Sequence, residues 1–139
     1  MQCSNAEAAL SRDVLAAHVR SLLQDNPVQI ASLDTQTVKL WFAGRLEYSP
    51  VVRNLSTEGF ELFGGRLDYV DGQRVAALVY KRRLHRINVF VWPSDRGASV
   101  SYSGKLDGFN VFGWSKAGMT YWAVSDLNEG ELHEFQALL

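Results

Sequence analysis

Residues 71–82 read DGQRVAALVYKR, and this stretch decides the fold class. Its first two residues, Asp71-Gly72, are a strong signal for a tight turn between antiparallel strands. From Val75 to Tyr80, apolar residues then alternate between the two sides of an extended chain, so that both sides are apolar. We therefore predict a central strand over residues 74–82 that is covered by other elements on both faces.

Further strand signals surround this one. β-branched and aromatic residues are dense in five neighbouring segments, which we predict to be strands: residues 37–42, 63–70, 85–92, 109–114 and 120–125. Between them, the Ser- and Gly-rich segment 94–105 is typical of a loop, and Ser49-Pro50 predicts a short helical turn that runs to about Thr57.

Both ends of the chain have the pattern of helices. Apolar residues recur at three- to five-residue steps in the N-terminal segment, and Asn26-Pro27 ends that helix because the residue before a proline disfavours helical geometry. Near the other end, Asn128 has the properties of an N-cap, with Glu131 three residues later. We predict one α+β domain over residues 1–139, with an N-terminal helix (1–26), a mainly antiparallel sheet of about five or six strands in a meander (36–125), and a C-terminal helix (128–139) packed on the sheet.

The charge and the cysteine content exclude several classes of protein. Fourteen Lys and Arg residues against fifteen Asp and Glu residues give a net charge of -1, which argues against a general nucleic-acid binder. The one cysteine, Cys3, can form neither an internal disulfide nor a zinc site alone, and the three histidines lack metal-ligand spacing. The sequence therefore predicts no metal, no cofactor and no direct contact with nucleic acid.

One seven-residue pattern occurs twice. The first copy, residues 42–48, reads FAGRLEY, and the second copy, residues 63–69, reads FGGRLDY. Two copies are too few for a repeat architecture. The simpler interpretation is two similar strands bent at glycine, each with an Arg and a carboxylate two residues apart on one face. The alternative is a pseudo-symmetric polar site built from both Arg/acid pairs.

Four cationic side chains lie within residues 81–86, which read KRRLHR. A hairpin tip of this composition can hold an anion, a lipid headgroup or a partner that carries carboxylates. The simpler interpretation is a solvated turn. The last helix can then pair with it, because the chain has several acidic residues and no Lys or Arg after Lys116.

The sequence offers little for catalysis. It contains no nucleophile elbow, no phosphate-binding loop and no dinucleotide fingerprint. Ser125, Asp126, His85 and His133 have the residue types that a small hydrolase would need. The four tryptophans fall on predicted strands, and an exposed groove lined by them would bind a small molecule.

Several segments, taken together and in order, resemble a known family. They are residues 18–22 (HVRSL), 34–44 (DTQTVKLWFAG), 59–69 (GFELFGGRLDY), 75–80 (VAALVY), 85–93 (HRINVFVWP) and 121–127 (YWAVSDL). Together they resemble the extracytoplasmic C-terminal domain of bacterial transmembrane anti-sigma factors, which partner extracytoplasmic-function sigma factors. The resemblance spans residues 13–138. The family pattern has a histidine and a proline where this chain has Gln36 and Leu40, so no role of that histidine is carried over.

The resemblance implies a non-enzymatic sensor or interaction domain that regulates sigma-factor-dependent transcription. Its parent would be a bacterial inner-membrane protein, with this domain in the periplasm. A cytoplasmic segment would hold the sigma factor, and one transmembrane helix would connect that segment to residues 1–139. The domain itself would meet an envelope ligand, a partner protein or a regulatory protease, and a homodimer is left open.

The segments that match the family also indicate a candidate binding surface. Arg66 and Asp68 lie where neighbouring glycines allow a close approach of the backbone. Two other functions stay open: a free-standing small-molecule-binding protein with a Trp-lined groove and Arg66 as its anchor, and a small hydrolase. The residues that complete the predicted polar patch are Lys39, Trp41, Arg82, Arg83 and His85.

Overall fold

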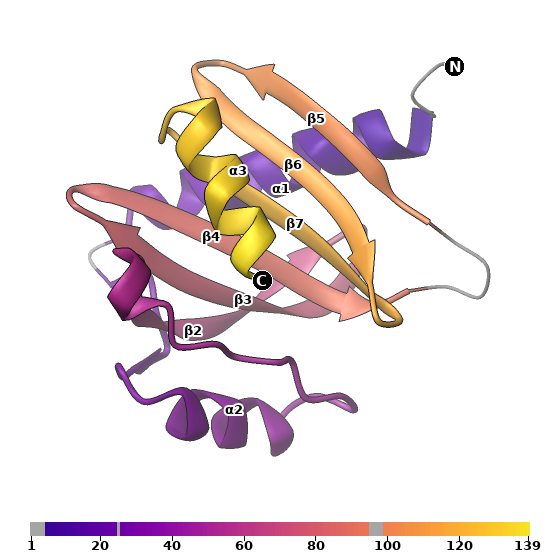
Figure 1. Cartoon of the computed structure of the whole chain (residues 1–139). Helices are drawn as coiled ribbons and strands as arrows, with labels where there is room; N and C mark the ends of the chain where they lie inside the picture. The colour runs from indigo at the N-terminus through magenta and orange to yellow at the C-terminus, as the bar shows by residue number, and fades with distance from the viewer. Residues whose placement is uncertain (1–4, 25, 95–98) are drawn as a thin grey trace.

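The computed structural model describes residues 5–24, 26–94 and 99–139, and within these residues it contains one antiparallel sheet and three α-helices. The helices are α1 (Asn5–Leu22), α2 (Thr35–Ala43) and α3 (Glu129–Leu138), with a short 3-10 helix, η1 (Ser56–Glu58). The strands are β1 (Ile30–Ala31), β2 (Glu61–Val70), β3 (Gln73–Arg82), β4 (His85–Pro93), β5 (Ser101–Leu106), β6 (Phe109–Lys116) and β7 (Met119–Ser125). Their order in the sheet is β1-β2-β3-β4-β7-β6-β5 (Figure 1). The α+β class with a helix at each end is therefore confirmed.

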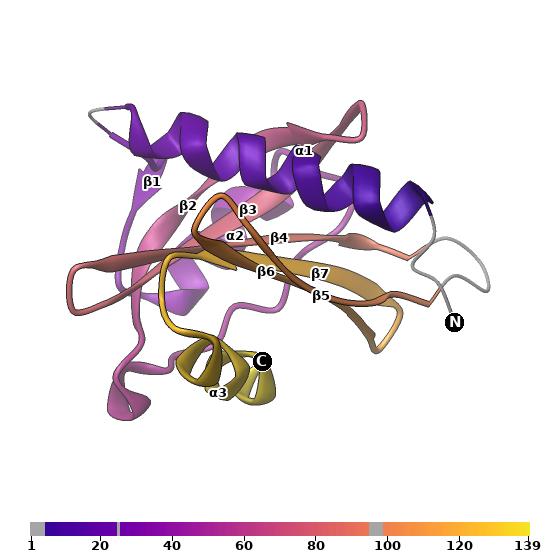
Figure 2. The ribbon, with the colours of Figure 1, turned by 90° about the horizontal axis from the view of Figure 1, so that it is seen from above.

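The helices cover the two faces of the sheet. Helix α1 runs across one face, and α2, the segment after it and α3 lie on the other (Figures 1 and 2). On the α1 face the core includes Val14, Phe90 and Trp122. On the opposite face it includes Leu78 and Phe135, among other apolar side chains. Two hydrophobic layers thus hold the sheet between them, and each is built from alternate residues of the same strands.

The central strand is confirmed in detail. Every residue from Val75 to Tyr80 is at most 1% exposed, and β3 has β2 on one side and β4 on the other. The turn before it is made by Asp71 and Gly72, which both adopt positive φ angles of 55° and 73°. These angles suit a two-residue hairpin turn, so the local sequence signal and the tertiary structure agree.

The strand predicted over residues 37–42 is wrong, because this segment is helix α2. The carboxylate of Asp34 caps the helix, accepting hydrogen bonds from Gln36 N and Thr37 Oγ1. Val38 and Phe42 lie one turn apart and are both fully buried. The cap and this buried pair stabilise a helix despite the β-branched and aromatic composition. The first copy of the repeated pattern consequently spans a helix end and the following segment, not a strand.

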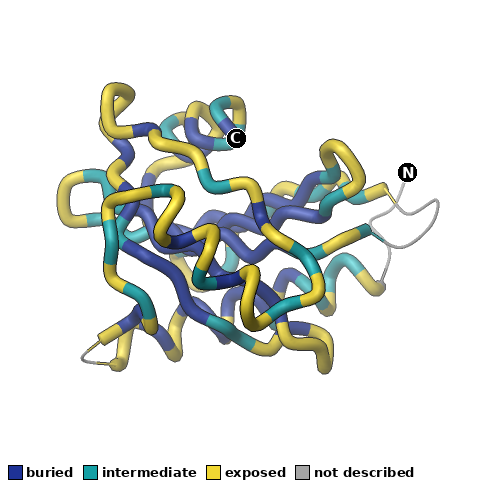
Figure 3. Tube along the Cα trace, turned by 90° about the horizontal axis from the view of Figure 1, so that it is seen from below, coloured by how far each residue is buried: buried dark blue, intermediate teal, exposed yellow. Residues whose placement is uncertain are grey.

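Three further expectations differ from the structure. The helical turn predicted from Ser49 is reduced to the short η1, and the preceding residues are irregular. Residues 101–105 of the predicted loop belong to β5, because they pair with β6 around the Asp107-Gly108 turn; residues 95–98 lie outside the described part of the chain. In the part of the chain that the structure describes, the sheet has seven strands rather than about five or six, and β7 lies between β4 and β6 instead of following a simple meander. Figure 3 shows the buried strands behind the more exposed α2 and the chain after it.

Candidate functional site

Arg66 is the centre of a buried polar cluster between α1 and the sheet. Its side chain is 7% exposed and forms an ion pair with Asp68, whose Oδ2 lies 3.0 Å from both Nε and Nη2. The Nη1 atom donates to Oδ1 of Asn88 at 2.7 Å and to the carbonyl of Pro27 at 3.2 Å. The Arg and the carboxylate two residues apart thus share a strand face, as predicted, and this face is covered by α1.

Asn88 links Arg66 to His18 on α1. The guanidinium of Arg66 can only donate hydrogen bonds, so the Asn88 atom that faces it must be the acceptor Oδ1. The other amide atom of Asn88, Nδ2, therefore faces Nδ1 of His18 at 2.5 Å. The Nδ1 atom of His18 must accept this bond, so the ring is neutral and carries its proton on Nε2. Burial, with a contribution from the charge of Arg66, lowers the pKa of His18 from 6.5 to about 4.

The same cluster fastens the last turns of α1. Nδ2 of Asn88 also donates to the hydroxyl of Ser21 at 3.2 Å, and Nη2 of Arg20 lies 3.5 Å from Oδ1 of Asp68. A hollow of about 140 Å³ separates the end of α1 from β2 at this point. The cluster therefore joins α1 to two strands, β2 and β4, through polar contacts in addition to the apolar core.

Arg82, Arg83 and His85 belong to a second, more exposed cluster beside α3. Arg82 Nε and Arg83 Nη2 lie 2.8 Å and 3.0 Å from the two carboxylate oxygens of Glu131. Nδ1 of His85 lies 2.9 Å from Oδ1 of Asp126, just before α3. The interpretation that the acidic last helix pairs with the cationic hairpin is therefore confirmed.

The predicted polar patch does not form one surface. Arg66 and Asp68 face α1, whereas the Arg82 cluster faces α3 on the opposite side of the sheet. Lys39 and Trp41 lie on α2, where Lys39 is exposed and Trp41 stacks beneath the guanidinium of Arg45 at 4.3 Å. The sheet separates Arg66 and Asp68 from Lys39, Trp41 and the Arg82 cluster, which the sequence could not show because the topology was unknown. For the same reason the Arg/acid pairs of the two copies do not form a common site.

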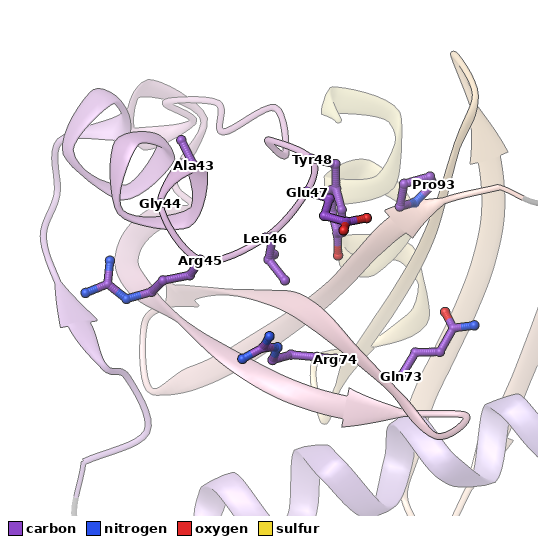
Figure 4. A pocket seen from close by; sticks show the side chains of 9 residues that line it. All are labelled: Ala43, Gly44, Arg45, Leu46, Glu47, Tyr48, Gln73, Arg74 and Pro93. Atoms are coloured by element: carbon purple, nitrogen blue, oxygen red, sulfur yellow. The ribbon is translucent and has the colours of Figure 1, made fainter.

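An open cleft of about 740 Å³ lies beside the first copy of the pattern (Figure 4). Figure 4 shows the side chain of Leu46 above that of Arg74, with Arg45 to one side and Glu47 on the other side, near Pro93. Arg74 and Glu47 give this cleft charges of both signs. The lining residues are Ala43, Gly44, Arg45, Leu46, Glu47, Tyr48, Gln73, Arg74 and Pro93.

The tryptophans do not share a groove. Trp92 and Trp122 belong to the core on the α1 face, whereas Trp41 and Trp114 belong to the core on the other face. The cleft of Figure 4 has no tryptophan among its lining residues. A small molecule in this cleft would contact charged and aliphatic side chains and Tyr48 rather than indole rings.

The hydrolase candidates are only partly brought together. His85 and Asp126 form the pair described above, but the hydroxyl of Ser125 donates to the carbonyl of Arg86 and accepts from Leu127 N, and Ser125 is fully buried. The ring of His133 instead packs on Phe112, with 4.3 Å between ring centroids. The Ser125 hydroxyl therefore serves the junction between β7 and α3.

Sequence reasoning missed Asn88 and the partnership of His18 with it. The signal that would have found Asn88 is its place in an otherwise apolar strand, since a polar side chain there must find a buried partner. Within the described residues, no group of three His, Cys, Asp or Glu side chains is arranged to hold a metal ion, and no helix there is both long enough and apolar enough to span a bilayer. Comparison of the chain with known protein families, curated proteins and solved structures found no match.

Proposed function

We propose that this chain is the periplasmic, non-catalytic sensor or interaction domain of a bacterial transmembrane anti-sigma factor. The proposal starts from the ordered segments of sequence that resemble that family. The structural observation that supports it is the attachment of α1, at the N-terminal side of the domain, to the middle of the sheet through His18, Asn88 and Arg66.

This attachment suits a domain that transmits a signal. A transmembrane helix preceding the domain would lead into α1, and α1 contacts β2, β5, β6 and β7. An envelope ligand, partner protein or regulatory protease that altered the sheet would therefore alter the support of α1. Such a ligand must favour one arrangement of α1 over another, because a ligand that binds both equally shifts nothing. The sigma factor would bind the cytoplasmic segment, and this domain would touch neither sigma factor nor DNA.

The test begins with the gene. We expect the reading frame upstream of the Met1 codon to be open and to encode about 20 consecutive apolar residues after a short cytoplasmic segment. The tagged full-length protein should then retain the sigma factor encoded beside it, and deletion of the cytoplasmic segment should abolish retention. A stop codon immediately upstream, or a full-length protein that retains no sigma factor, would contradict the proposal.

A second test addresses the role of the domain. In cells with a reporter for the sigma-dependent promoter, Arg66→Met in the full-length protein should change reporter output, because it removes the guanidinium that orients Asn88 toward α1. Arg45→Met, at the matching position of the first copy, should leave output unchanged, since Arg45 is exposed and its guanidinium hydrogen-bonds and stacks on Trp41 of α2 rather than on α1. Immunoblots must show equal amounts of the two variants. If the two variants give equal reporter output at equal abundance, the contacts of Arg66 that support α1 play no part in signalling.

The second candidate function is binding of a small molecule, and the cleft of Figure 4 favours it. Its volume of about 740 Å³ is within the range of ligand sites, and Arg74 and Glu47 can orient a ligand that carries both charges. Screening free amino acids and short peptides by calorimetry, with Arg74→Gln as the control, tests this function. Binding that Arg74→Gln does not weaken would place the ligand elsewhere.

A further inference from the structure

The two edges of the sheet differ in whether the outward backbone groups of the edge strand are hydrogen-bonded. At the β1 edge, side chains satisfy backbone groups of β2 that β1 is too short to reach. Gln29 Oε1 accepts from Leu67 N at 2.8 Å, and Asp68 Oδ1 accepts from Tyr69 N at 2.8 Å. This edge is thereby closed to another strand.

Among the described residues, nothing closes the β5 edge in this way. Leu106 and Phe109 flank the two-residue turn Asp107-Gly108, so Leu106 exchanges both of its backbone hydrogen bonds with β6. Alternation along β5 then directs the N–H and C=O groups of every second residue away from β6. Within the described part of the chain, these outward groups have no hydrogen-bond partner. Figure 2 looks toward this edge and shows no helix across it. The outward residues are Ser101, Ser103 and Lys105.

We propose that β5 pairs antiparallel with β5 of a second copy of this chain, with Ser103 at the twofold axis. In this register Ser101 lies opposite Lys105 of the second copy, so the two lysines do not face each other. The three outward residues of each chain then form about six inter-chain backbone hydrogen bonds.

The edge matches itself because Ser101 and Ser103 have small side chains and its one charge lies away from the axis. Lys105 is the only charged residue of β5. Apart from this lysine, β5 carries no proline and no bulge, which are the other devices that keep an edge from pairing. The net charge of -1 adds little repulsion between copies. The dimer goes beyond the proposed function, since it requires neither the membrane helix nor the sigma factor.

The register is tested by cysteine cross-linking. In a Cys3→Ser background, Ser103→Cys places the two thiols of the dimer opposite each other, so an intermolecular disulfide should form about tenfold or more faster than from a thiol that meets only by diffusion. Leu84→Cys is the matched control, because Leu84 is 94% exposed at the tip of the β3–β4 hairpin. Equal rates for the two variants would overturn the proposal.

Sedimentation velocity provides an independent measurement. Ser103→Pro removes an outward N–H that β5 does not use toward β6, so it should shift the dimer to monomer while circular dichroism stays native. Ser103→Ala keeps the N–H and should remain dimeric. If Ser103→Pro does not fold, the cross-linking comparison decides alone. A wild-type protein that stays monomeric while its β5 edge binds an extended peptide of another protein would also overturn the proposal.

Discussion

The first copy of the repeated pattern, residues 42–48, and the second copy, residues 63–69, have nearly the same sequence and different structures. The first copy ends helix α2 and continues as an irregular segment, whereas the second copy lies within strand β2. Their side chains have exchanged environments. Arg66 and the hydroxyl of Tyr48 are bonded within the fold, whereas Arg45 and Tyr69 are exposed.

The two copies also contact each other. A Cβ atom on Gly65 would come within 2.8 Å of the Phe42 ring, so the second copy must be small at the place where the first copy inserts its phenylalanine. What differs is therefore the surroundings that distant elements supply: α1 and β4 to Arg66, and β3 and β4 to Tyr48. The matched positions allow each effect to be measured against a control with the same residue type.

The largest difference is expected between the two arginines. Arg66→Met leaves the Asp68 carboxylate without its main partner and removes the donor to Asn88, so we expect a loss of about 3–5 kcal/mol of unfolding free energy. Arg45→Met should cost less than about 1 kcal/mol, because Arg45 is exposed and its hydrogen bond and ring contact are both to the neighbouring Trp41. Urea unfolding of this chain measures both. Equal losses would show that burial does not distinguish the two copies.

The environment of Arg66 also predicts a pH dependence through His18. A pKa of about 4 in the folded protein, against 6.5 in the unfolded chain, means that the unfolded state binds more protons between these values. The neutral, buried His18 therefore stabilises the fold fully above pH 6.5, and this stabilisation is lost as the pH falls toward 4. The complete loss lowers the free energy of unfolding by about 3 kcal/mol.

A substitution of His18 isolates its pH-dependent contribution to stability from that of the charged groups around it. Arg66 on β2 and Arg86 on β4 lower the pKa of His18, and Asp126 raises it. The stability of His18→Gln, which keeps an acceptor for Asn88, should fall below wild type at pH 7, and the gap should narrow by about 3 kcal/mol at pH 4. Urea unfolding at several pH values measures the gap. A constant gap would contradict the neutral, buried state of His18.

The fold was predictable where a local signal and the tertiary structure agree. Asp71-Gly72 identified a hairpin, and the two apolar sides of β3 identified a covered central strand. Segment 37–42 was misinterpreted because Val38 and Phe42 fit strand alternation as well as helical spacing, and the cap at Asp34 was overlooked. Strand β5 is polar and contains glycine, yet the Asp107-Gly108 turn at its end was a usable signal.

The candidate site was predictable only over short separations. Arg66 and Asp68 are two residues apart, so period-two alternation places them on the same strand face. Asn88 and His18 are distant in sequence, and only the packing of α1 over β2 and β4 brings them to Arg66. Arg82 and Arg83 were assigned to the same patch because sequence alone does not reveal that they face α3.

A smaller difference is expected between the glycines. Gly65→Ala brings a Cβ atom to 2.8 Å from the Phe42 ring and 3.3 Å from the carbonyl of Ala77, and a buried ring between two layers cannot move freely. We expect a loss of about 1–3 kcal/mol. Gly44→Ala should be neutral to within about 0.5 kcal/mol, because no atom lies within 4 Å of the added Cβ and φ is -85°. Thermal unfolding of both variants measures the difference, and similar midpoints would mean that Phe42 can shift.

The smallest difference is expected between the tyrosines, and here the first copy should be the sensitive one. The Tyr48 hydroxyl donates to Val91 O at 2.7 Å and accepts from Ala76 N at 3.0 Å, so it stands between the paired residues Ala76 and Val91 at the end of β3 and β4. Tyr48→Phe should cost about 1 kcal/mol. The loss stays modest because the two strands can then bond each other directly.

Tyr69→Phe is the matched control, since Tyr69 is 63% exposed and its hydroxyl has no hydrogen-bond partner among the described residues. It should leave the unfolding free energy unchanged. Hydrogen exchange at the Ala76 amide extends the comparison. In Tyr48→Phe this amide should exchange at the native rate if β3 and β4 close and it bonds Val91 O directly, and faster than in wild type if that bond does not form. A loss in Tyr69→Phe equal to that in Tyr48→Phe would contradict the exchange of roles between the two copies.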